Sequence, residues 1–361
     1  MPYKVAFQTQ QWLVARLNQI RICMTNTTWF KPPLCREMIS PSSILKRLNS
    51  SSSILKRLNV PLVQFFPGRR MDRMLVCLLL AGMVGAEVQE ILSPECKQFL
   101  YMGTLPRGLE EQPFKKICQF YAGKPRFITL YDTFSRIPVY SAYTFKRSDG
   151  FKKVDVPWMY EPQLSMKSDS REMQHLPSDN HHGSFEDSQA VLEDYSNSVI
   201  FERGQLNPDE HQGDLDDKAA TYTLTNVVPQ VREFNIGPWK NHEHTIRQRL
   251  NNYCRGTAYV ITGITTSGHT IRRENINRLG IPTYLWSAYC CTNFDHNAPY
   301  SERSKFPAFA AHGLNDKVDN KVQEMTVQQL EIFLKKVTYV DSSFQIFYQN
   351  CDPAINMLNK S

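Results

Sequence analysis

Glu202-Arg-Gly-Gln-Leu-Asn-Pro208 opens the most informative stretch of this sequence, which continues through Thr223-Leu-Thr-Asn226 and ends at Glu243. Asn235 precedes Glu243 by eight residues. That distance is about two turns of a helix, so both side chains can lie along one side of it. An amide oxygen and a carboxylate are hard ligands, which suit a Mg²⁺ ion that keeps several waters. The spacing therefore indicates a candidate cation site.

A helix that carries a carboxylate in its apolar stripe is expected next. Gly237-Pro238 suits its start, because the N–H that proline lacks would have no partner in the first turn. Glu243 then shares one face, at spacings of three and four residues, with Trp239, Ile246, Leu250 and Tyr253. A carboxylate is rarely buried unless it is paired or binds a metal. Glu243 is therefore either a metal-site residue or an edge-of-stripe glutamate in an ion pair.

Strand-like and helical segments do not alternate regularly along the chain. Aromatic and β-branched runs bounded by turn formers predict strands, at residues 125–132, 138–145, 258–264 and 284–291. A second apolar stripe predicts a helix over 326–337, and the polar residues 165–190 are expected to form a long surface loop. This order favours an α+β domain over a doubly wound parallel sheet.

Charge is distributed unevenly along the sequence. Residues 1–86 hold 12 Lys and Arg against two acidic residues, whereas residues 87–361 hold 30 basic and 33 acidic residues, a balance of −3. Any phosphate binding must therefore come from a local patch. The candidates are Arg203 and two clusters that are otherwise solvated surface, Arg247/Arg249 and Arg272/Arg273.

Residues 71–86 have the parts of a secretory signal peptide. Met71-Asp-Arg-Met74 precedes a 12-residue apolar run that ends in small residues. A membrane span would need roughly 18–20 apolar residues. We therefore interpret 1–70 as an N-terminal extension, unstructured or an artefact of the gene model, with translation starting at Met71 or Met74. A folded domain at 87–354 and a tail at 355–361 follow.

The cysteines of residues 87–361 form an even set, as expected of disulfides in an oxidising compartment. They are Cys96, Cys118, Cys254, Cys290, Cys291 and Cys351. Their spacing leaves the pairing open. No closely spaced Cys-x-x-Cys occurs among them, so a zinc site is not expected.

The stretch 202–243 resembles the metal-finger signature of the DNA/RNA non-specific endonucleases, most closely their secreted endonuclease domain-containing 1-like branch. The family pattern opens Asp-Arg-Gly-His, where this chain has Glu202-Arg-Gly-Gln205. The family's two asparagines and its glutamate follow at matching intervals, at Asn226, Asn235 and Glu243. The resemblance implies an α+β, ββα-metal finger nuclease fold with a central, mainly antiparallel sheet flanked by helices.

The resemblance also implies roles for single residues. Asn235 would carry a divalent cation, Mg²⁺ or another such as Mn²⁺, and Glu243 would hold a water bound to it. Asn226 would orient the general base. Arg203 would contact a phosphate oxygen of the substrate, DNA or RNA. Gln205 stands at the position of the base itself.

Gln205 is the serious departure from the family pattern. Its amide can position a water but cannot take a proton from it, and the loss of a general base costs roughly 10²–10⁴-fold in rate. His211, six residues later, either replaces the base or is an exposed loop histidine. His242 and His244 flank Glu243 and are expected to point away from its stripe.

Two functions of different classes remain open. The first is a secreted, Mg²⁺-dependent endonuclease of DNA and RNA with little sequence preference, since contacts to phosphate and sugar carry no base information. Its activity would be weak. The second is a non-catalytic extracellular binding protein that keeps the nuclease fold.

Overall fold

The computed structural model describes residues 88–89, 92–110, 112–150, 154–165, 170–175, 182–196, 198–338 and 340–352. All of them belong to one unit, Gly82–Ser361. The expected N-terminal extension, signal peptide and C-terminal tail (1–70, 71–86 and 355–361) lie outside the described residues. Among the described residues, no helix combines the length and apolarity that crossing a bilayer requires.

Eight strands of the described part form one sheet, in which all neighbours are antiparallel. Their order is β1 (Val88–Gln89), β2 (Lys115–Tyr121), β3 (Lys124–Asp132), β4 (Ile137–Thr144), β7 (Ala258–Arg273), β8 (Ile276–Cys291), β9 (Ala308–Leu314) and β10 (Gln323–Met325). A separate antiparallel pair joins β5 (Phe201–Gln205) to β6 (Val227–Val231). The strands expected at 125–132 and 138–145 correspond to β3 and β4.

Helices of the described part are mostly short. The α-helices are α6 (His182–Ser188), α7 (Glu193–Ser196), α8 (Leu215–Ala220), α9 (Arg232–Phe234), α10 (Lys240–Tyr253), α11 (Tyr300–Arg303) and α12 (Val327–Val337). Single turns occur at η1 (Lys97–Phe99), η2 (Tyr101–Gly103), η3 (Pro162–Leu164), η4 (Asp209–His211), η5 (Leu224–Asn226), η6 (Asn235–Trp239) and η7 (Tyr348–Cys351). An antiparallel sheet with helices confirms the expected α+β class.

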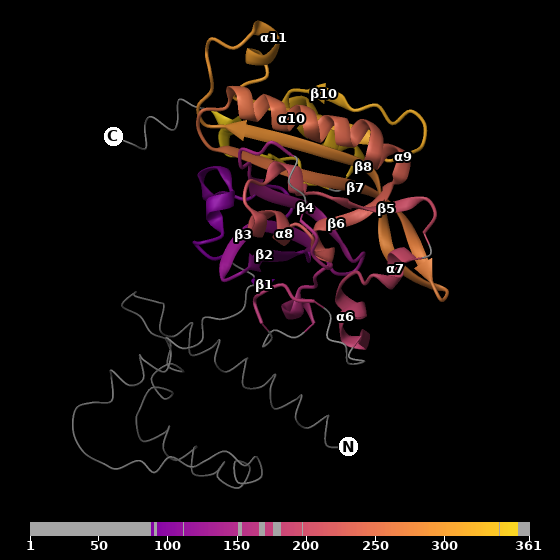
Figure 1. The fold of residues 1–361 in the computed structure, drawn as a ribbon. Coiled ribbons are helices and arrows are strands. Elements are labelled where there is room, and N and C mark those ends of the chain that lie inside the picture. The colour runs from indigo at the N-terminus through magenta and orange to yellow at the C-terminus, as the bar shows by residue number, and fades with distance from the viewer. Residues whose placement is uncertain are drawn as a thin grey trace, which may run out of the picture. The chain divides into compact units, whose positions relative to one another are not determined.

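Strands β7 and β8 are much longer than the expected segments 258–264 and 284–291. Each has 16 residues, and their outer halves form a hairpin that projects beside α7 (Figure 1). Glu274 and Asn275 turn the chain with φ angles of 51° and 64°, the left-handed pair that a two-residue hairpin turn requires. The outer half of β7 is mostly exposed, so the apolar pattern that predicted the inner half ends before the strand does.

The polar segment 165–190 was expected to be loop throughout, and this prediction was wrong in part. Helix α6 occupies its end. Residues 166–169 and 176–181 of the segment lie outside the described residues.

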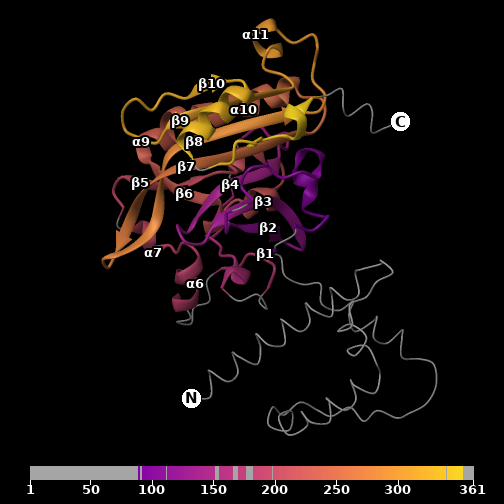
Figure 2. The same cartoon turned by 180° about the vertical axis from the view of Figure 1, so that it is seen from behind.

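The sheet is covered on both faces. Helix α10 lies across β7 and β8 on one face (Figure 1), and the yellow helix α12 lies on the opposite face (Figure 2). Trp286, Ala288 and Cys290 of β8 belong to the core beneath α12, together with Leu330 and Leu334 of that helix. The alternate β8 residues Tyr289 and Cys291 belong to the core beneath α10. The core is therefore split by the sheet, as the period of two along a strand requires.

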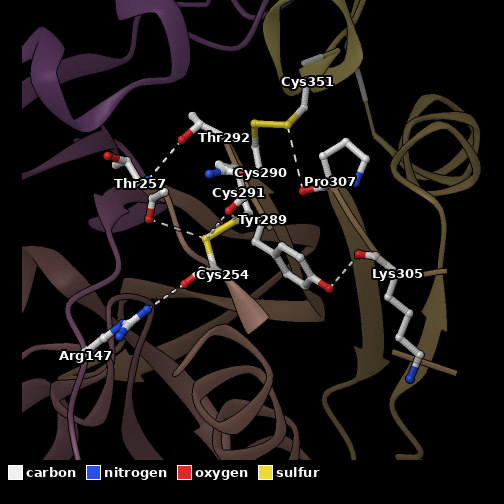
Figure 3. Close-up of a disulfide and its surroundings, with 12 residues drawn as sticks. Arg147, Cys254, Thr257, Tyr289, Cys290, Cys291, Thr292, Lys305, Pro307 and Cys351 are labelled. Carbon is white, nitrogen blue, oxygen red and sulfur yellow. Dashed lines mark hydrogen bonds between the residues drawn. A yellow bond between two sulfur atoms is a disulfide. The ribbon is translucent and has the colours of Figure 1, made fainter. Parts of the chain in front are cut away.

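Because adjacent residues of a strand point to opposite faces, the two adjacent cysteines of β8 form disulfides on opposite sides of the sheet (Figure 3). Cys291 bonds Cys254, which caps the C-terminus of α10, and Cys290 bonds Cys351 near the C-terminal end of the described chain. The third disulfide joins Cys96 to Cys118 of β2. All six cysteines of the described residues are paired, which confirms the expected even set.

Removing the two β8 disulfides one at a time should have different local effects. They close loops of 37 and 61 residues, so each should contribute roughly 4 kcal/mol to the free energy of unfolding, measurable by urea denaturation. Cys254→Ser/Cys291→Ser should also lose hydrogen-exchange protection in the last turn of α10. Cys290→Ser/Cys351→Ser is the matched control and should keep that protection. An equal loss of this protection in both variants would contradict the conclusion that the Cys254–Cys291 disulfide holds the end of α10.

Candidate active site

The candidate site is built from the β5–β6 pair and the helix that follows it. The two strands pair with Gly204 opposite Val228 and Gln205 opposite Val227. A side chain at Gly204 would overlap the buried Gln230 of β6, so only glycine allows the strands to approach in this way. Two strands followed by α10 form the ββα unit that was expected.

The helix starts differently from the expectation at Gly237-Pro238. The chain is already helical in α9, widens into a π-turn at η6, and α10 begins only at Lys240. Gly237 is the irregular point, with φ −107° and ψ −109°. Proline at 238 is accommodated because the bulge removes the need for its N–H. Asn235 thus lies on the bulge and Glu243 on the first turn of the regular helix.

A cleft of about 420 Å³ opens between these elements. It is lined by Asp149, Gly150, Arg203, Gln205, Pro208, Asp209, Glu210, Tyr222, Asn235, Ile236, Lys240, Glu243, His244 and Arg247. Four of the five residues expected at the site therefore meet in one cleft. The exception is Asn226, which is fully buried and does not line it.

Asn235 is held by Glu202, the residue that stands where the family has aspartate. The Asn235 amide nitrogen donates to Oε2 of Glu202 at 2.9 Å. Because that bond fixes the amide orientation, the other end of the amide, Oδ1, is free to act as a ligand. Arg232 lies 3.4 Å from the second Glu202 oxygen and balances its charge. The sequence did not suggest this contact, which depends on the β5–η6 approach.

Glu243 is half-buried and lies among other carboxylates. Burial raises the pKa of Glu243 well above its ordinary value, and the nearby charges of Glu210 and Asp209 raise it further. The Trp239 indole and the Lys240 ammonium act in the opposite direction. A carboxylate in these surroundings is stabilised by any cation that approaches it. Glu243 thus belongs to an acidic cleft lining, and its role as a metal-site residue stays a prediction.

Gln205 is fixed by one end only. Its amide nitrogen donates to the carbonyl and the hydroxyl of Thr221, at 3.1 and 3.0 Å. Asn226 donates to the same Thr221 carbonyl at 2.9 Å, and its own carbonyl accepts from Ser141 of β4. Asn226 therefore reaches Gln205 only through Thr221 and does not touch it directly.

The three histidines near the site are used differently from one another. His211 is buried: its Nε2 donates to the Glu243 backbone carbonyl at 2.9 Å and its Nδ1 accepts from Tyr143 at 2.8 Å. Burial lowers the pKa of His211. With both nitrogens engaged and no place in the cleft lining, His211 is neither a replacement base nor the exposed loop histidine of the other interpretation.

His242 and His244, which were expected to point away from the stripe of Glu243, lie in different surroundings. His242 is buried against Ser287 of β8, and burial lowers its pKa to about 4. His244 is exposed and lines the cleft, where its Nδ1 accepts from Arg247 at 2.9 Å. The exposed position of His244 is compatible with a side chain that points away from the buried stripe, and it adds His244 to the cleft wall.

Of the two clusters proposed for phosphate binding, only one residue, Arg247, lies at the cleft. Arg247 lines the cleft and pairs with Glu210 at 3.0 Å, but Arg249 is buried and pairs with Glu302 and Glu324. Arg272 and Arg273 line a different cavity at the β7–β8 hairpin. Arg203 is exposed at the cleft, where its guanidinium lies 5.0 Å from the centre of the Trp158 ring.

The donor set of the cleft fits a hard divalent cation. Within the described residues no three His, Cys, Asp or Glu side chains converge as a metal cluster. The amide oxygen of Asn235 and the carboxylate of Glu243 are few but hard donors, which suits Mg²⁺ because it keeps several waters. Asp209 and Glu210 add negative charge to the same lining. Sequence spacing did not single them out, although both directly follow the 202–208 motif.

Replacing Glu243 should stabilise the metal-free protein in a pH-dependent way. The pKa of Glu243 is raised in the folded state. Its contribution to the free energy of unfolding is therefore fully present below the pKa of the unfolded chain, and it is lost as pH rises through the folded pKa. In EDTA, Glu243→Gln and wild type should melt alike near pH 4. At neutral pH the variant should have the higher Tm, by about 2–4 °C per kcal/mol. Glu233→Gln, an exposed glutamate of α9, is the control. Parallel Tm curves across the pH range would refute the assignment.

Comparison with known proteins identifies the family. The family model for DNA/RNA non-specific endonucleases matches residues 113–343. Endonuclease domain-containing 1 protein of Homo sapiens is 34% identical over 225 residues, or 60% of this chain and 42% of that protein. Its counterpart in Mus musculus is 33% identical over 59% of this chain and 42% of its own length. The chain thus matches less than half the length of these relatives.

A solved structure of the EndoG/EndoGI complex, titled as the mechanism of EndoG inhibition, is also similar. It covers 59% of this chain and 83% of its own, with 18% identity and a TM-score of 0.39, too low to decide anything further. The family model, by contrast, spans well over half of the sequence, in the part that holds the cleft. The chain therefore belongs to the DNA/RNA non-specific endonuclease family.

Proposed function

We propose that this protein is a secreted, Mg²⁺-dependent endonuclease that hydrolyses phosphodiester bonds of DNA and RNA, slowly and without strong sequence preference. The observation that carries the proposal is the convergence of Asn235, Glu243 and Arg203 in one cleft. An oxygen donor, a carboxylate and a guanidinium are what a scissile phosphate and its cation need around them. Family membership supports the same reaction class.

The charges of the cleft explain why a cation is required. The lining holds four carboxyl groups (Asp149, Asp209, Glu210 and Glu243) against three permanent cations (Arg203, Lys240 and Arg247). A phosphodiester entering this lining meets no excess of positive charge, unlike the basic surfaces on which nucleic acids usually bind. Asn235 and Glu243 would hold the Mg²⁺. When bound, the ion would stabilise the charge that develops on the phosphate and on the leaving oxygen.

The remaining residues bind and position. Arg203 would contact a phosphate oxygen, and Glu202 keeps the Asn235 amide in its ligand orientation. Gln205 presents its amide oxygen while its nitrogen is held by Thr221. That oxygen can accept a hydrogen bond from an attacking water and orient it. It cannot take the proton, so turnover is expected to be slow.

The three disulfides within the described part of the chain support secretion, because such bonds persist in oxidising compartments. The expected signal segment, 71–86, is outside the described residues. A non-catalytic extracellular binding protein is the second candidate. Gln205 favours it, because a nuclease cleft without its base could bind nucleic acid and release it uncut.

Gln205→His should raise the rate of cleavage by roughly 10²–10⁴-fold, because it restores a general base. The Thr221 carbonyl that now accepts from the Gln205 amide would accept from one ring N–H and leave the other nitrogen basic. The assay is nicking of supercoiled plasmid and degradation of RNA by the full chain, produced with its disulfides, in Mg²⁺ and in EDTA.

Glu243→Ala and Gln205→Ala serve as controls. Glu243→Ala should abolish cleavage in both the wild-type and the Gln205→His backgrounds. If Gln205→His stays inert and calorimetry finds no Mg²⁺ binding to the wild type, the enzymatic proposal is lost. Mg²⁺ binding without cleavage would support the binding protein. Fast wild-type cleavage that survives Gln205→Ala would show that the base is another residue.

A further inference from the structure

Three planar groups lie together at the edge of the cleft. The proposed reaction uses Arg203 but neither Trp158 nor Tyr222. The Arg203 guanidinium lies over the Trp158 ring at 5.0 Å from its centre. The rings of Trp158 and Tyr222 are 5.3 Å apart and tilted by 50°. Trp158 and Tyr222 are half-buried, and Arg203 is exposed. We refer to Trp158, Tyr222 and Arg203 as the aromatic ledge.

The aromatic ledge is held rigidly by the backbone on either side of it. The N–H of Met159, which follows Trp158, donates to the carbonyl of Tyr222 at 2.9 Å, and the N–H of Leu224 donates back to Met159. The hydroxyl of Tyr222 donates to Asp209 at 3.0 Å. A surface that is fixed before binding loses little conformational entropy when a ligand arrives.

The ledge is continuous with the cleft, because Tyr222 and Arg203 line both. A nucleotide whose phosphate lies beside Arg203 therefore has its base within reach of the rings. Bases stack on aromatic side chains and on guanidinium planes, with a strength that depends little on sequence. A base can do so only when it is unpaired, since taking it out of a duplex costs a few kcal/mol.

The charges of the cleft mean that phosphate contacts alone cannot bind nucleic acid tightly, so a second contribution is needed. The cleft has more carboxyl groups than permanent cations, so contacts to phosphate alone give it little affinity for nucleic acid. Stacking does not depend on charge and can supply what the phosphate contacts lack. The ledge is placed where such a contribution would act on a strand that passes the catalytic groups.

We propose that the aromatic ledge binds an unpaired nucleobase beside the phosphate in the cleft, and that it makes the protein selective for single-stranded over double-stranded nucleic acid. The proposal rests on the proposed function only for the position of the phosphate. It predicts a recognition surface that would operate equally in a slow enzyme and in a non-catalytic binding protein.

The test is binding of a fluorescein-labelled oligothymidine of about 12 nucleotides, within the usual range of single-strand sites, measured by fluorescence anisotropy in EDTA. Three probes are compared: the strand itself, the same strand in a duplex, and a base-free strand with the same phosphates. Wild type should bind the strand at least about ten-fold more tightly than either of the others. Equal affinity for all three probes would overturn the proposal.

Variants of the full chain test the residues. Trp158→Ala should weaken binding of the strand by about 5- to 100-fold and leave binding of the base-free strand unchanged. Trp158→Phe and Tyr222→Phe keep a ring and should bind nearly as well as wild type. Phe134→Ala removes an aromatic side chain that is 89% exposed outside the cleft lining and is the matched control. Thermal melting confirms that each variant is folded.

The outcomes separate this proposal from the enzymatic one. Because binding is measured without a divalent cation, ledge-dependent binding without cleavage in Mg²⁺ would sink the nuclease activity and leave the ledge standing. Cleavage of single strands and duplexes at equal rates, unaffected by Trp158→Ala, would support the nuclease activity and overturn the ledge proposal. If Trp158→Ala fails to fold, Trp158→Leu, which keeps apolar bulk without a ring, replaces it and should show the same loss.

Discussion

Successive side chains of β8 point to opposite faces of the sheet, and both layers of the domain depend on this constraint. Ser287, Tyr289 and Cys291 face α10, where they bond His242, pack in the core and form a disulfide with Cys254. The residues between them, Ala288 and Cys290, face the core beneath α12. A shift of the register by one residue would exchange the two sets and detach α10 from the sheet.

The position of α10 in turn sets the position of Glu243. The disulfide at Cys254 holds one end of the helix, and His211 holds the other by donating to the Glu243 carbonyl. Tyr143 of β4 donates to the second nitrogen of His211 and so ties this contact to the sheet. A neutral, buried histidine thus serves as a fixed bridge between two segments. Rigid support of this kind holds catalytic groups in a productive geometry more precisely than a loop could.

The sequence allowed the architecture to be predicted and named four residues that meet in one cleft, but it did not show how they are held. Spacing placed Asn235 and Glu243 on one side of a helix, and the structure has both in the cleft. Spacing could not place Asn226, because its burial depends on β4, which supplies Ser141 from 85 residues away. The Glu202–Asn235 bond and the partners of His211 are also long-range contacts. Such contacts leave no periodic pattern in the local sequence.

In the proposed reaction, Gln205 would alter the proton transfer, while Thr221 fixes the geometry around it. Thr221 accepts from the Gln205 nitrogen and from Asn226 through the same carbonyl, so the strand end is braced whether or not a base is present. The cleft has carboxyl groups that a cation would stabilise, and burial together with the charges of Glu210 and Asp209 raises the pKa of Glu243. A chain that had lost all use for its cleft would gain stability by neutralising Glu243. A carboxylate kept in the cleft lining, beside Asp209 and Glu210, is consistent with the proposed Mg²⁺ site.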